Sequence, residues 1–137
     1  MITGLNHITL AVNDIARSLS FYSDLLNFQP HARWNHGAYL SCGDLWLCLS
    51  VDKVSVSTDY THIAFSVSKE EYPAIAGRLE SAGVAIWKNN KSEGNSLYFL
   101  DPDQHKLELH DGDLASRLQA VDHTPYEGWV RLDNPHT

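Results

Sequence analysis

Two stretches of the chain alternate between apolar and polar residues with a period of two, the pattern of a half-buried β-strand. They are residues 5–12 (LNHITLAV) and 60–67 (YTHIAFSV), and they align at an offset of 55 residues. His7 then matches His62, and each stretch runs into a segment whose apolar residues have helical spacing. The chain is therefore predicted to contain two copies of one structural unit.

Both units are predicted to continue through a helix into further strands. Asp14 is the expected N-cap of the first helix, and residues 68–71 (SKEE) have the pattern of a capping box before the second. Asn27 and Gly83 stand where a left-handed residue would end each helix. The later strands are expected at about 36–41 and 45–50 in the first unit, and at about 97–100 and 106–110 in the second.

The predicted fold class is α+β, with two βαβββ modules that form curved mixed sheets and carry their helices outside. We expect a single domain over residues 1–137: module 1 at about 1–55, module 2 at about 56–112, a helix at about 114–121 and an irregular tail within 113–137. The composition fits a globular protein, since 43% of the residues are hydrophobic and 20% are charged. The formal charge of −7 disfavours nucleic acid and anionic membranes, so an anionic ligand needs a local cluster of positive charge.

The two cysteines, Cys42 and Cys48, are too few for a disulfide framework and fit a reducing compartment. No apolar run approaches the ~20 residues that a membrane span needs. The first residues lack the charged start and apolar stretch of a signal peptide. We therefore expect a cytoplasmic protein that binds neither nucleic acid nor membranes.

One face of each predicted strand is apolar, whereas the opposite face carries residues typical of a lined cavity. His7 and Thr9 share that face on the first strand, His62 takes the matching place on its repeat, and Glu108 lies on the last strand. Two imidazoles and one carboxylate suit Zn, Fe, Mn or Co and leave coordination positions open for a substrate. The alternative is that these are ordinary half-buried polar residues. The two histidines at matching places of the repeat favour a metal site. Glu108 favours it further, because a lone buried carboxylate is costly without a cation.

Other histidines and one cysteine are weaker candidates. His110 lies on the cavity face near a strand end, where it can support the metal ligands, and His105 is expected in a turn. Turn-like or terminal stretches hold the remaining histidines: His31, His36, His123 and His136. Cys48 falls where the repeat would place a fourth metal ligand, but its apolar neighbours favour a filler role over a nucleophile.

Three segments carry a family resemblance: the strand with His7, its repeat with His62, and residues 101–108 (DPDQHKLE). Together they resemble the vicinal-oxygen-chelate, or glyoxalase-like, superfamily. Within it the chain resembles the FosA-type fosfomycin-inactivating glutathione transferases over about residues 1–130. The most specific part of the resemblance is a set of polar residues in the second half: Lys88, SEGNS (92–96), Tyr98 and Arg117.

The resemblance implies a homodimer of paired modules with two Mn(II) sites. Each site would take His7 from one chain and both His62 and Glu108 from the other. The resemblance also implies a potassium ion in the loop formed by Ser92, Glu93, Gly94, Asn95 and Ser96. Glutathione would be the co-substrate, and its thiol would add to the oxirane of fosfomycin and so confer fosfomycin resistance.

The remaining roles follow from the resemblance and from the residue types. Cationic and hydroxyl side chains would bind the phosphonate of fosfomycin: Lys88, Ser96, Tyr98 and Arg117. Thr9 would assist the opening oxirane oxygen, while Tyr39 and Tyr60 would orient the glutathione thiol or stabilise its thiolate. Trp46 and Cys48 would form the wall beside the oxirane carbons.

Two other interpretations stay open. The first is another metal enzyme of the superfamily, a glyoxalase or an extradiol dioxygenase, since dioxygenases use two histidines and one carboxylate with Fe(II). The phosphonate cluster disfavours a dioxygenase, and the missing fourth ligand on the Cys48 strand disfavours a glyoxalase. The second is a non-catalytic drug-binding protein. The presence of all three candidate metal ligands, His7, His62 and Glu108, disfavours this interpretation. A related branch of the fosfomycin-inactivating enzymes uses thiols other than glutathione, such as bacillithiol or cysteine.

Overall fold

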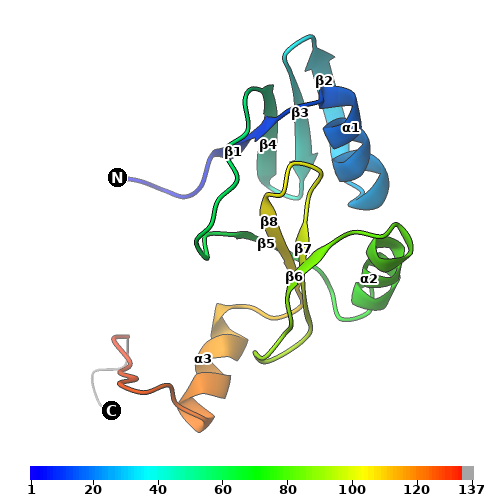
Figure 1. Cartoon of the computed structure of the whole chain (residues 1–137). Helices are drawn as coiled ribbons and strands as arrows, with labels where there is room; N and C mark the ends of the chain where they lie inside the picture. The colour runs from blue at the N-terminus through cyan, green and yellow to red at the C-terminus, as the bar shows by residue number, and fades with distance from the viewer. Residues whose placement is uncertain (134–137) are drawn as a thin grey trace.

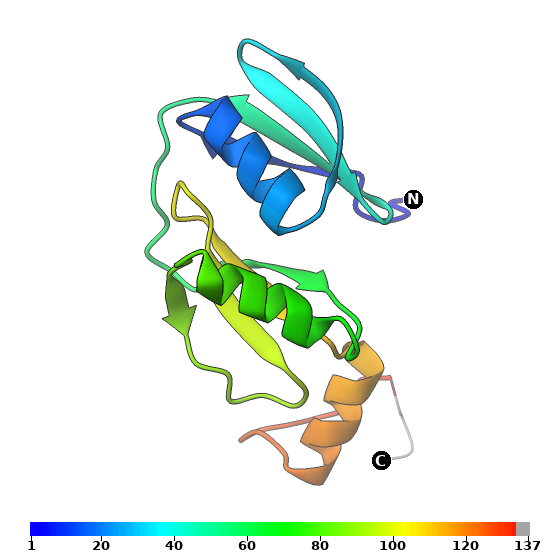
Figure 2. The same cartoon turned by 90° about the vertical axis from the view of Figure 1, so that its right-hand side faces the viewer.

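The computed structural model describes residues 1–133, in which two four-stranded mixed sheets lie side by side (Figures 1 and 2). The first module comprises β1 (His7–Val12), α1 (Ile15–Ser20), the π-helix η1 (Phe21–Leu25), β2 (Gln29–Trp34), β3 (Gly37–Cys42) and β4 (Leu45–Val51). The second comprises β5 (Ile63–Ser66), α2 (Tyr72–Ser81), β6 (Ile86–Lys88), β7 (Ser96–Leu100) and β8 (Lys106–His110). The final helix is α3 (Leu114–His123).

The two sheets have the same topology, which confirms the predicted pair of βαβββ modules. Their strand orders are β1-β4-β3-β2 and β5-β8-β7-β6. The first strand of each module pairs in parallel with the last, and the other neighbours are antiparallel. Both β1 and β5 are therefore edge strands of their sheets.

The helix boundaries follow the local signals of the sequence. The side chain of Asp14 accepts the N–H of Arg17 at 3.1 Å, as expected for an N-cap. Asn27 and Gly83 have φ angles of 62° and 72°, the left-handed conformation predicted at the helix ends. The capping box predicted for the second helix is not formed, because α2 begins at Tyr72 with Glu71 as its N-cap and without a side-chain cap. The Ser68 hydroxyl accepts the N–H of Glu71 at 3.1 Å in the turn that precedes the helix.

The first helix widens where the sequence analysis expects an uninterrupted stripe. Its last turn is the π-helix η1, in which the N–H of Leu26 donates to the carbonyl of Phe21 at 3.2 Å. The wider turn places Phe21 and Tyr22, which are neighbours in sequence, in the core together.

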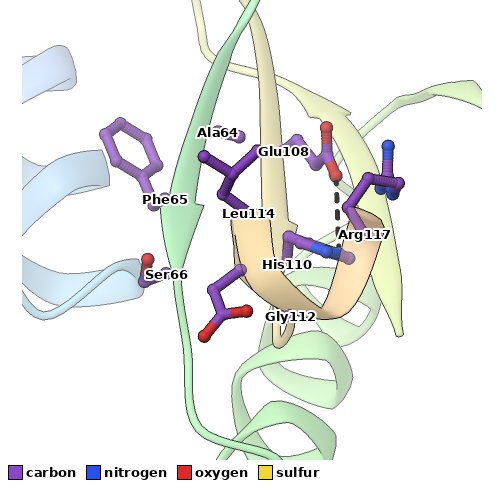
Figure 3. Close-up of a pocket in the computed structure, with 9 residues that line it drawn as sticks. Ala64, Phe65, Ser66, Glu108, His110, Gly112, Leu114 and Arg117 are labelled. Atoms are coloured by element: carbon purple, nitrogen blue, oxygen red, sulfur yellow. Dashed lines mark ion pairs between the residues drawn. The ribbon is translucent and has the colours of Figure 1, made fainter. Parts of the chain in front are cut away.

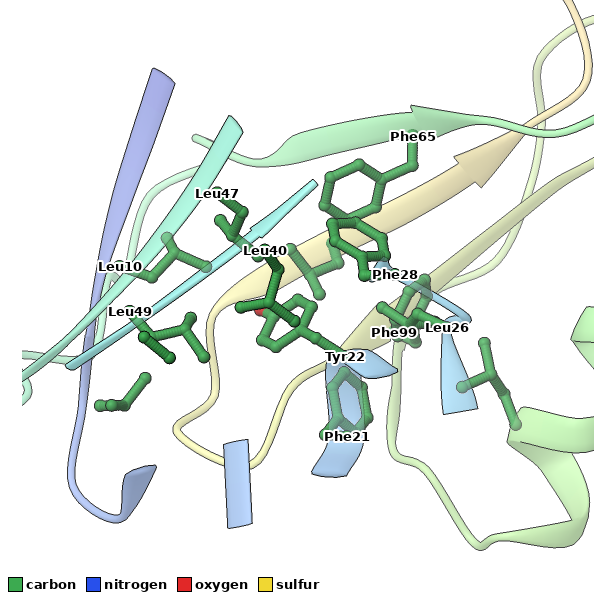
Figure 4. Packing of buried hydrophobic residues seen from close by; sticks show 14 of the residues in the cluster. Leu10, Phe21, Tyr22, Leu26, Phe28, Leu40, Leu47, Leu49, Phe65 and Phe99 are labelled. Atoms are coloured by element: carbon green, nitrogen blue, oxygen red, sulfur yellow. The ribbon is translucent and has the colours of Figure 1, made fainter. Parts of the chain in front are cut away.

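One hydrophobic core crosses both modules (Figure 4). Phe28 packs edge-to-face on Phe65 with ring centroids 5.2 Å apart, and Phe21 lies 6.4 Å from Phe99. These pairs join the first module to strands of the second, so neither sheet has a separate core.

A buried polar contact joins the same two modules. The hydroxyl of Tyr22 donates to the carboxylate of Asp101 at 2.6 Å, and Asp101 also accepts the N–H groups of Asp103 and His105, each at 2.9 Å. Burial raises the pKa of Tyr22 well above its ordinary value, and the nearby charge of Asp101 acts in the same direction. The turn before β8 is thereby held against the first helix.

The expectation for His31 needs correction. His31 lies in β2 and not in a turn, and its Nε2 is 2.6 Å from the Ser41 hydroxyl. All residues of β2 are exposed, so the strand has no apolar alternation to reveal it. His105 lies at the end of the turn before β8, as expected, and its Nε2 donates to the carbonyl of Ala11 in β1 at 2.7 Å. His136 lies outside the described residues.

None of the helices within residues 1–133 has the length and apolar character required to cross a bilayer.

Candidate functional site

The strand register of the second sheet brings polar side chains from three strands into one row. Glu108 of β8 stands opposite Ala64 of β5 and opposite Tyr98 of β7, and Tyr98 stands opposite Lys88 of β6. Residues directly opposite one another project from the same face of a sheet. Glu108, Tyr98 and Lys88 therefore share one face, as the alternation predicts.

The buried Glu108 and the half-buried His62 form a pair at the edge of this row. Glu108 is 5% exposed, and its Oε1 lies 2.9 Å from Nε2 of His62. Nδ1 of His62 is 2.9 Å from the carbonyl oxygen of Tyr60, so it must carry the proton in a neutral imidazole. Nε2 then presents a lone pair to a carboxylate oxygen. Two acceptors at this distance require a proton or a metal cation, so the pair fits metal binding.

His7 occupies the matching place in the first sheet. Its ring lies 4.5 Å from that of Trp46, centroid to centroid, and its Nδ1 is 2.7 Å from Oδ1 of Asn6. The amide oxygen accepts the Nδ1 proton, which leaves Nε2 of this exposed histidine as a possible ligand. Within residues 1–133, no three His, Cys, Asp or Glu side chains gather closely enough to hold a metal. One copy of the chain thus brings His62 to Glu108 but does not bring His7 to them.

The register also shows which residue of the first module corresponds to Glu108. The equivalent rows are Ala64, Glu108 and Tyr98 in the second module and Thr9, Cys48 and Tyr39 in the first. Cys48 is a buried free thiol at the position of the carboxylate. Tyr39 and Trp46 are exposed on the same face, with ring centroids 5.4 Å apart. The first module therefore presents one imidazole and an aromatic surface, without a second metal ligand on β4.

The loop of residues 92–96 is folded onto the end of β8 and onto α3. Oε1 of Glu93 accepts from Nε of Arg117 at 3.0 Å and from Nε2 of His110 at 3.2 Å. The Ser96 hydroxyl lies 2.7 Å from Nδ1 of His110. Gly94 has φ of 72°, and a Cβ there would lie 2.6 Å from Oδ1 of Asp111, so a side chain does not fit.

Arg117 is held by an ion pair and is not a freely exposed cation. Partial burial opposes its charge, but the hydrogen bond and the charge of Glu93 outweigh burial and raise the pKa of Arg117. This contact could not be predicted from the sequence, because it joins a loop residue to a helix residue 24 positions away.

A pocket of about 360 Å³ lies beside Glu108 (Figure 3). Its lining includes Ala64, Ser66, Glu108, His110, Gly112 and Arg117. Figure 3 shows the side chains of Glu108 and His110 facing each other, and Nδ1 of His110 lies 3.9 Å from Oε2 of Glu108. Two of the predicted phosphonate ligands, Ser96 and Arg117, thus lie on the His110 side of Glu108.

The other two phosphonate ligands lie with an aromatic cluster on the β6 side. Nζ of Lys88 donates to the Tyr60 hydroxyl and stands 4.7 Å from the ring centroid of Tyr98. The bond to Tyr60 raises the pKa of Lys88, so its ammonium is charged at neutral pH.

Trp87 belongs to this cluster and was missed by the sequence analysis. The register shifts by one residue between Ile86 and Lys88, and such a bulge turns a side chain away from its alternating position. The ring of Trp87 consequently packs within 5.4 Å of His62 and 5.2 Å of Tyr98, centroid to centroid. A bulge in a three-residue strand leaves no signal in the alternation.

Comparison with known proteins identifies the family of this chain. Residues 4–109 match the family model of the Glyoxalase/Bleomycin resistance protein/Dioxygenase superfamily. The chain belongs to this superfamily. Its sequence is 56% identical to that of a glutathione transferase FosA from Serratia marcescens, across 95% of this chain and 96% of the relative. It is 36% identical to a metallothiol transferase FosB from Shouchella clausii, across 97% of both chains. The predicted family resemblance is thus confirmed.

Solved structures of fosfomycin resistance proteins have the same fold as this chain. The fosfomycin resistance protein FosX from Listeria monocytogenes superposes with a TM-score of 0.79 and 32% identity, covering 87% of this chain and 98% of that one. A mutant of the same FosX, solved with Mn(II) and 1S,2S-dihydroxypropylphosphonic acid, superposes with a TM-score of 0.77 and 31% identity over 87% and 99% of the chains.

Proposed function

We propose that this protein is a metal-dependent glutathione transferase that opens the oxirane of fosfomycin by thiol addition and so confers fosfomycin resistance. The observation that carries the proposal is the pair of the half-buried His62 and the buried Glu108, set on one sheet face between cationic groups on both sides. The 56% identity to a glutathione transferase FosA supports the same chemistry over nearly the whole chain.

The proposed metal is Mn(II), held by His62 and Glu108 of one chain and His7 of a second. The donor set fits, because Nε2 of His62 and the buried carboxylate of Glu108 face each other at a distance that a proton or a metal cation can bridge. When bound, the metal supplies Lewis-acid stabilisation for negative charge on the ring oxygen. The Mn(II) complex of the related FosX supports this choice of metal.

The proposal includes a homodimer in which each of two sites draws on both chains. A three-ligand site needs a second copy, since within residues 1–133 His7 lies in a different cluster from His62 and Glu108. The exposed face around His7, with Tyr39 and Trp46, is available for such pairing. We further propose that residues 1–137 act as one domain, with the module boundaries given above, and that the protein works in the reducing cytoplasm, in keeping with its two free cysteines.

The proposed substrate contacts use the charged and hydroxyl groups around Glu108. Lys88 and Arg117 would offset the phosphonate charge, with hydrogen bonds from Ser96 and Tyr98. Thr9 would donate a hydrogen bond to the ring oxygen as the C–O bond breaks. Tyr39 and Tyr60 would hold the attacking sulfur, and Trp46 and Cys48 would line the side of the oxirane carbons.

The proposal also includes a potassium ion bound by the loop Ser92–Ser96. The loop contributes carbonyl and hydroxyl oxygens, and Gly94 holds it in a tight left-handed turn. Lys88 already donates to Tyr60 and Arg117 already pairs with Glu93, so these two side chains would offset the phosphonate charge only in part. A monovalent cation near the phosphonate would offset more of that charge.

The test is incubation of the purified protein with fosfomycin, glutathione, Mn(II) and potassium, followed by phosphorus NMR. We expect the fosfomycin resonance to be replaced by that of a glutathione adduct. Parallel samples with cysteine or without thiol distinguish another thiol or water as the nucleophile. A sample in which fosfomycin persists, or disappears equally fast without glutathione, would overturn the proposal.

A further inference from the structure

A second pocket, of about 420 Å³, opens on the polar face of the second sheet. It is lined by Thr58, Asp59, Tyr60, Trp87, Lys88 and Lys106, and we call it the Lys106 pocket. Its volume lies within the range of sites that bind small organic molecules. Apart from Tyr60 and Lys88, none of these residues has a role in the function proposed above.

The Lys106 pocket and the pocket shown in Figure 3, which we call the His110 pocket, flank Glu108 from opposite ends of β8. Lys106, Glu108 and His110 alternate along this strand, so all three side chains project from one face. Glu108 and His110 line the first pocket, whereas Lys106 lines the second. The ring of Tyr60 connects the second pocket to the metal ligands, since its centroid lies 4.9 Å from that of His62. Two substrates bound in these two places would meet at Glu108.

The charges in the Lys106 pocket are arranged in a complementary pair. The ammonium of Lys106 donates one of its three N–H groups to the backbone carbonyl oxygen of Asp59. The carboxylate of Asp59 accepts the N–H of Thr61 at 3.0 Å, and this bond lowers the pKa of Asp59. Lys106 and Asp59 both line the pocket, and the charge of Lys106 also lowers the pKa of the Asp59 carboxyl.

An amino-acid head group has the matching charges. Its α-carboxylate and α-ammonium sit on one carbon atom, so neighbouring positive and negative groups recognise it together. Trp87 and Tyr60 add aromatic surface for an aliphatic chain, and the ring of Trp87 lies 5.6 Å from Nζ of Lys106. In glutathione this head group belongs to the γ-glutamyl residue, which is joined to the cysteine through its side chain.

We propose that the Lys106 pocket binds the γ-glutamyl head group of glutathione, with Lys106 on the α-carboxylate and Asp59 on the α-ammonium. The proposal rests on the glutathione transferase activity proposed above and names the residues that select the thiol. Bound in this way, the peptide can run past Tyr60 toward His62, so that the sulfur reaches the metal site from the side opposite to the His110 pocket.

The first experiment measures binding without turnover. Isothermal titration calorimetry of the Mn(II)-loaded protein with S-methylglutathione should give a Kd about tenfold higher in Lys106→Gln, the effect of losing one charge-assisted hydrogen bond. Lys106→Arg should recover most of the affinity because it keeps the charge. Lys53→Gln, which removes an exposed lysine outside the pocket, should bind like the wild type. Equal Kd values for wild type and Lys106→Gln would overturn the proposal.

The second experiment compares two thiols that differ only in the γ-glutamyl group. The wild type should have a much lower KM for glutathione than for cysteinylglycine, whereas Lys106→Gln should have similar KM values for both. The KM for fosfomycin should not change in the variant. If the wild type forms adduct but Lys106→Gln keeps its preference for glutathione, the pocket assignment is wrong and the transferase function stands. If the wild type forms no adduct, the function fails, and the calorimetry alone decides whether the pocket binds glutathione.

Discussion

Glu108 shows how far a single residue can be interpreted from the sequence. Its alternation with Leu107 and Leu109 predicts a polar side chain on the cavity face, and the structure places it beside His62. Trp87 could not be found in the same way, because a bulge and not the strand period sets its direction. The ion pair between Arg117 and Glu93 could not be predicted either, since it depends on how a loop packs against a helix.

Replacing Glu108 by Gln should separate metal binding from folding. The amide keeps the shape of the side chain but removes the charge that faces Nε2 of His62. We expect Mn(II) affinity to fall at least about 100-fold and turnover to be lost, while the circular dichroism spectrum is unchanged. Calorimetric titration with Mn(II) measures the first effect, and an unchanged Kd would contradict the assignment of Glu108 as a ligand.

At the scale of elements, the repeated strands and helices were predictable and the irregular ones were not. The apolar residues of strands β1, β4, β5 and β8 recur at every second position, because one face of each strand contributes to the hydrophobic core. Strand β2 has no buried residue and β6 has only three residues, so neither gives a periodic signal. The π-helix η1 was hidden because a wider turn depends on core packing more than on local sequence.

The loop Ser92–Ser96 should make the enzyme dependent on potassium. Activity should rise on adding potassium and rise much less with sodium, which fits a potassium-sized cage poorly. Glu93 ties the loop to Arg117 and His110, so Glu93→Ala should lose the difference between the two ions. Initial rates at matched ionic strength provide the measurement, with Glu80→Ala on the surface of α2 as the control. Equal wild-type rates in potassium, sodium and a bulky organic cation would show that the loop is only a turn.

The hydrogen bond between Tyr22 and Asp101 should hold the two modules together most strongly at neutral pH. Tyr22→Phe leaves a buried carboxylate oxygen without this donor and should lower the free energy of unfolding by about 1–3 kcal/mol. Because the pKa of Tyr22 is raised in the folded state, its contribution is complete below about pH 10 and is lost as the pH rises toward the folded pKa. Urea unfolding at neutral pH and above pH 10 should therefore show the difference between wild type and variant becoming smaller. A difference that grows with pH would contradict this account.

On the scale of the whole molecule, one core serves both modules, but neither module contains a complete metal site. The sequence could indicate the shared site only through a family resemblance, because alternation places residues on faces and does not say which chain a face meets. The isolated chain separates His7 from His62 and Glu108, and this separation is the physical reason to expect a second copy.

Mixing two inactive variants should restore activity if each site spans two chains. His7→Ala and His62→Ala each damage both sites of their own homodimers, but a mixed dimer contains one intact site. Random exchange should recover about a quarter of the wild-type activity, because half of the dimers are mixed and each has one of two sites complete. Initial rates after refolding the mixture measure the recovery. Verified mixed dimers that stay inactive would argue for sites within single chains.

The contacts of His7 with Trp46 and of His62 with Trp87 give the protein an optical signal of its own. Indole emission is quenched by a nearby paramagnetic ion, so Mn(II) bound to these histidines should darken both tryptophans. Trp129 donates to Asp122 in the C-terminal segment, where it contacts neither histidine, and should keep its emission. A fluorescence titration can therefore follow occupancy of the metal site without any attached dye, and Trp129→Phe would remove much of the constant background.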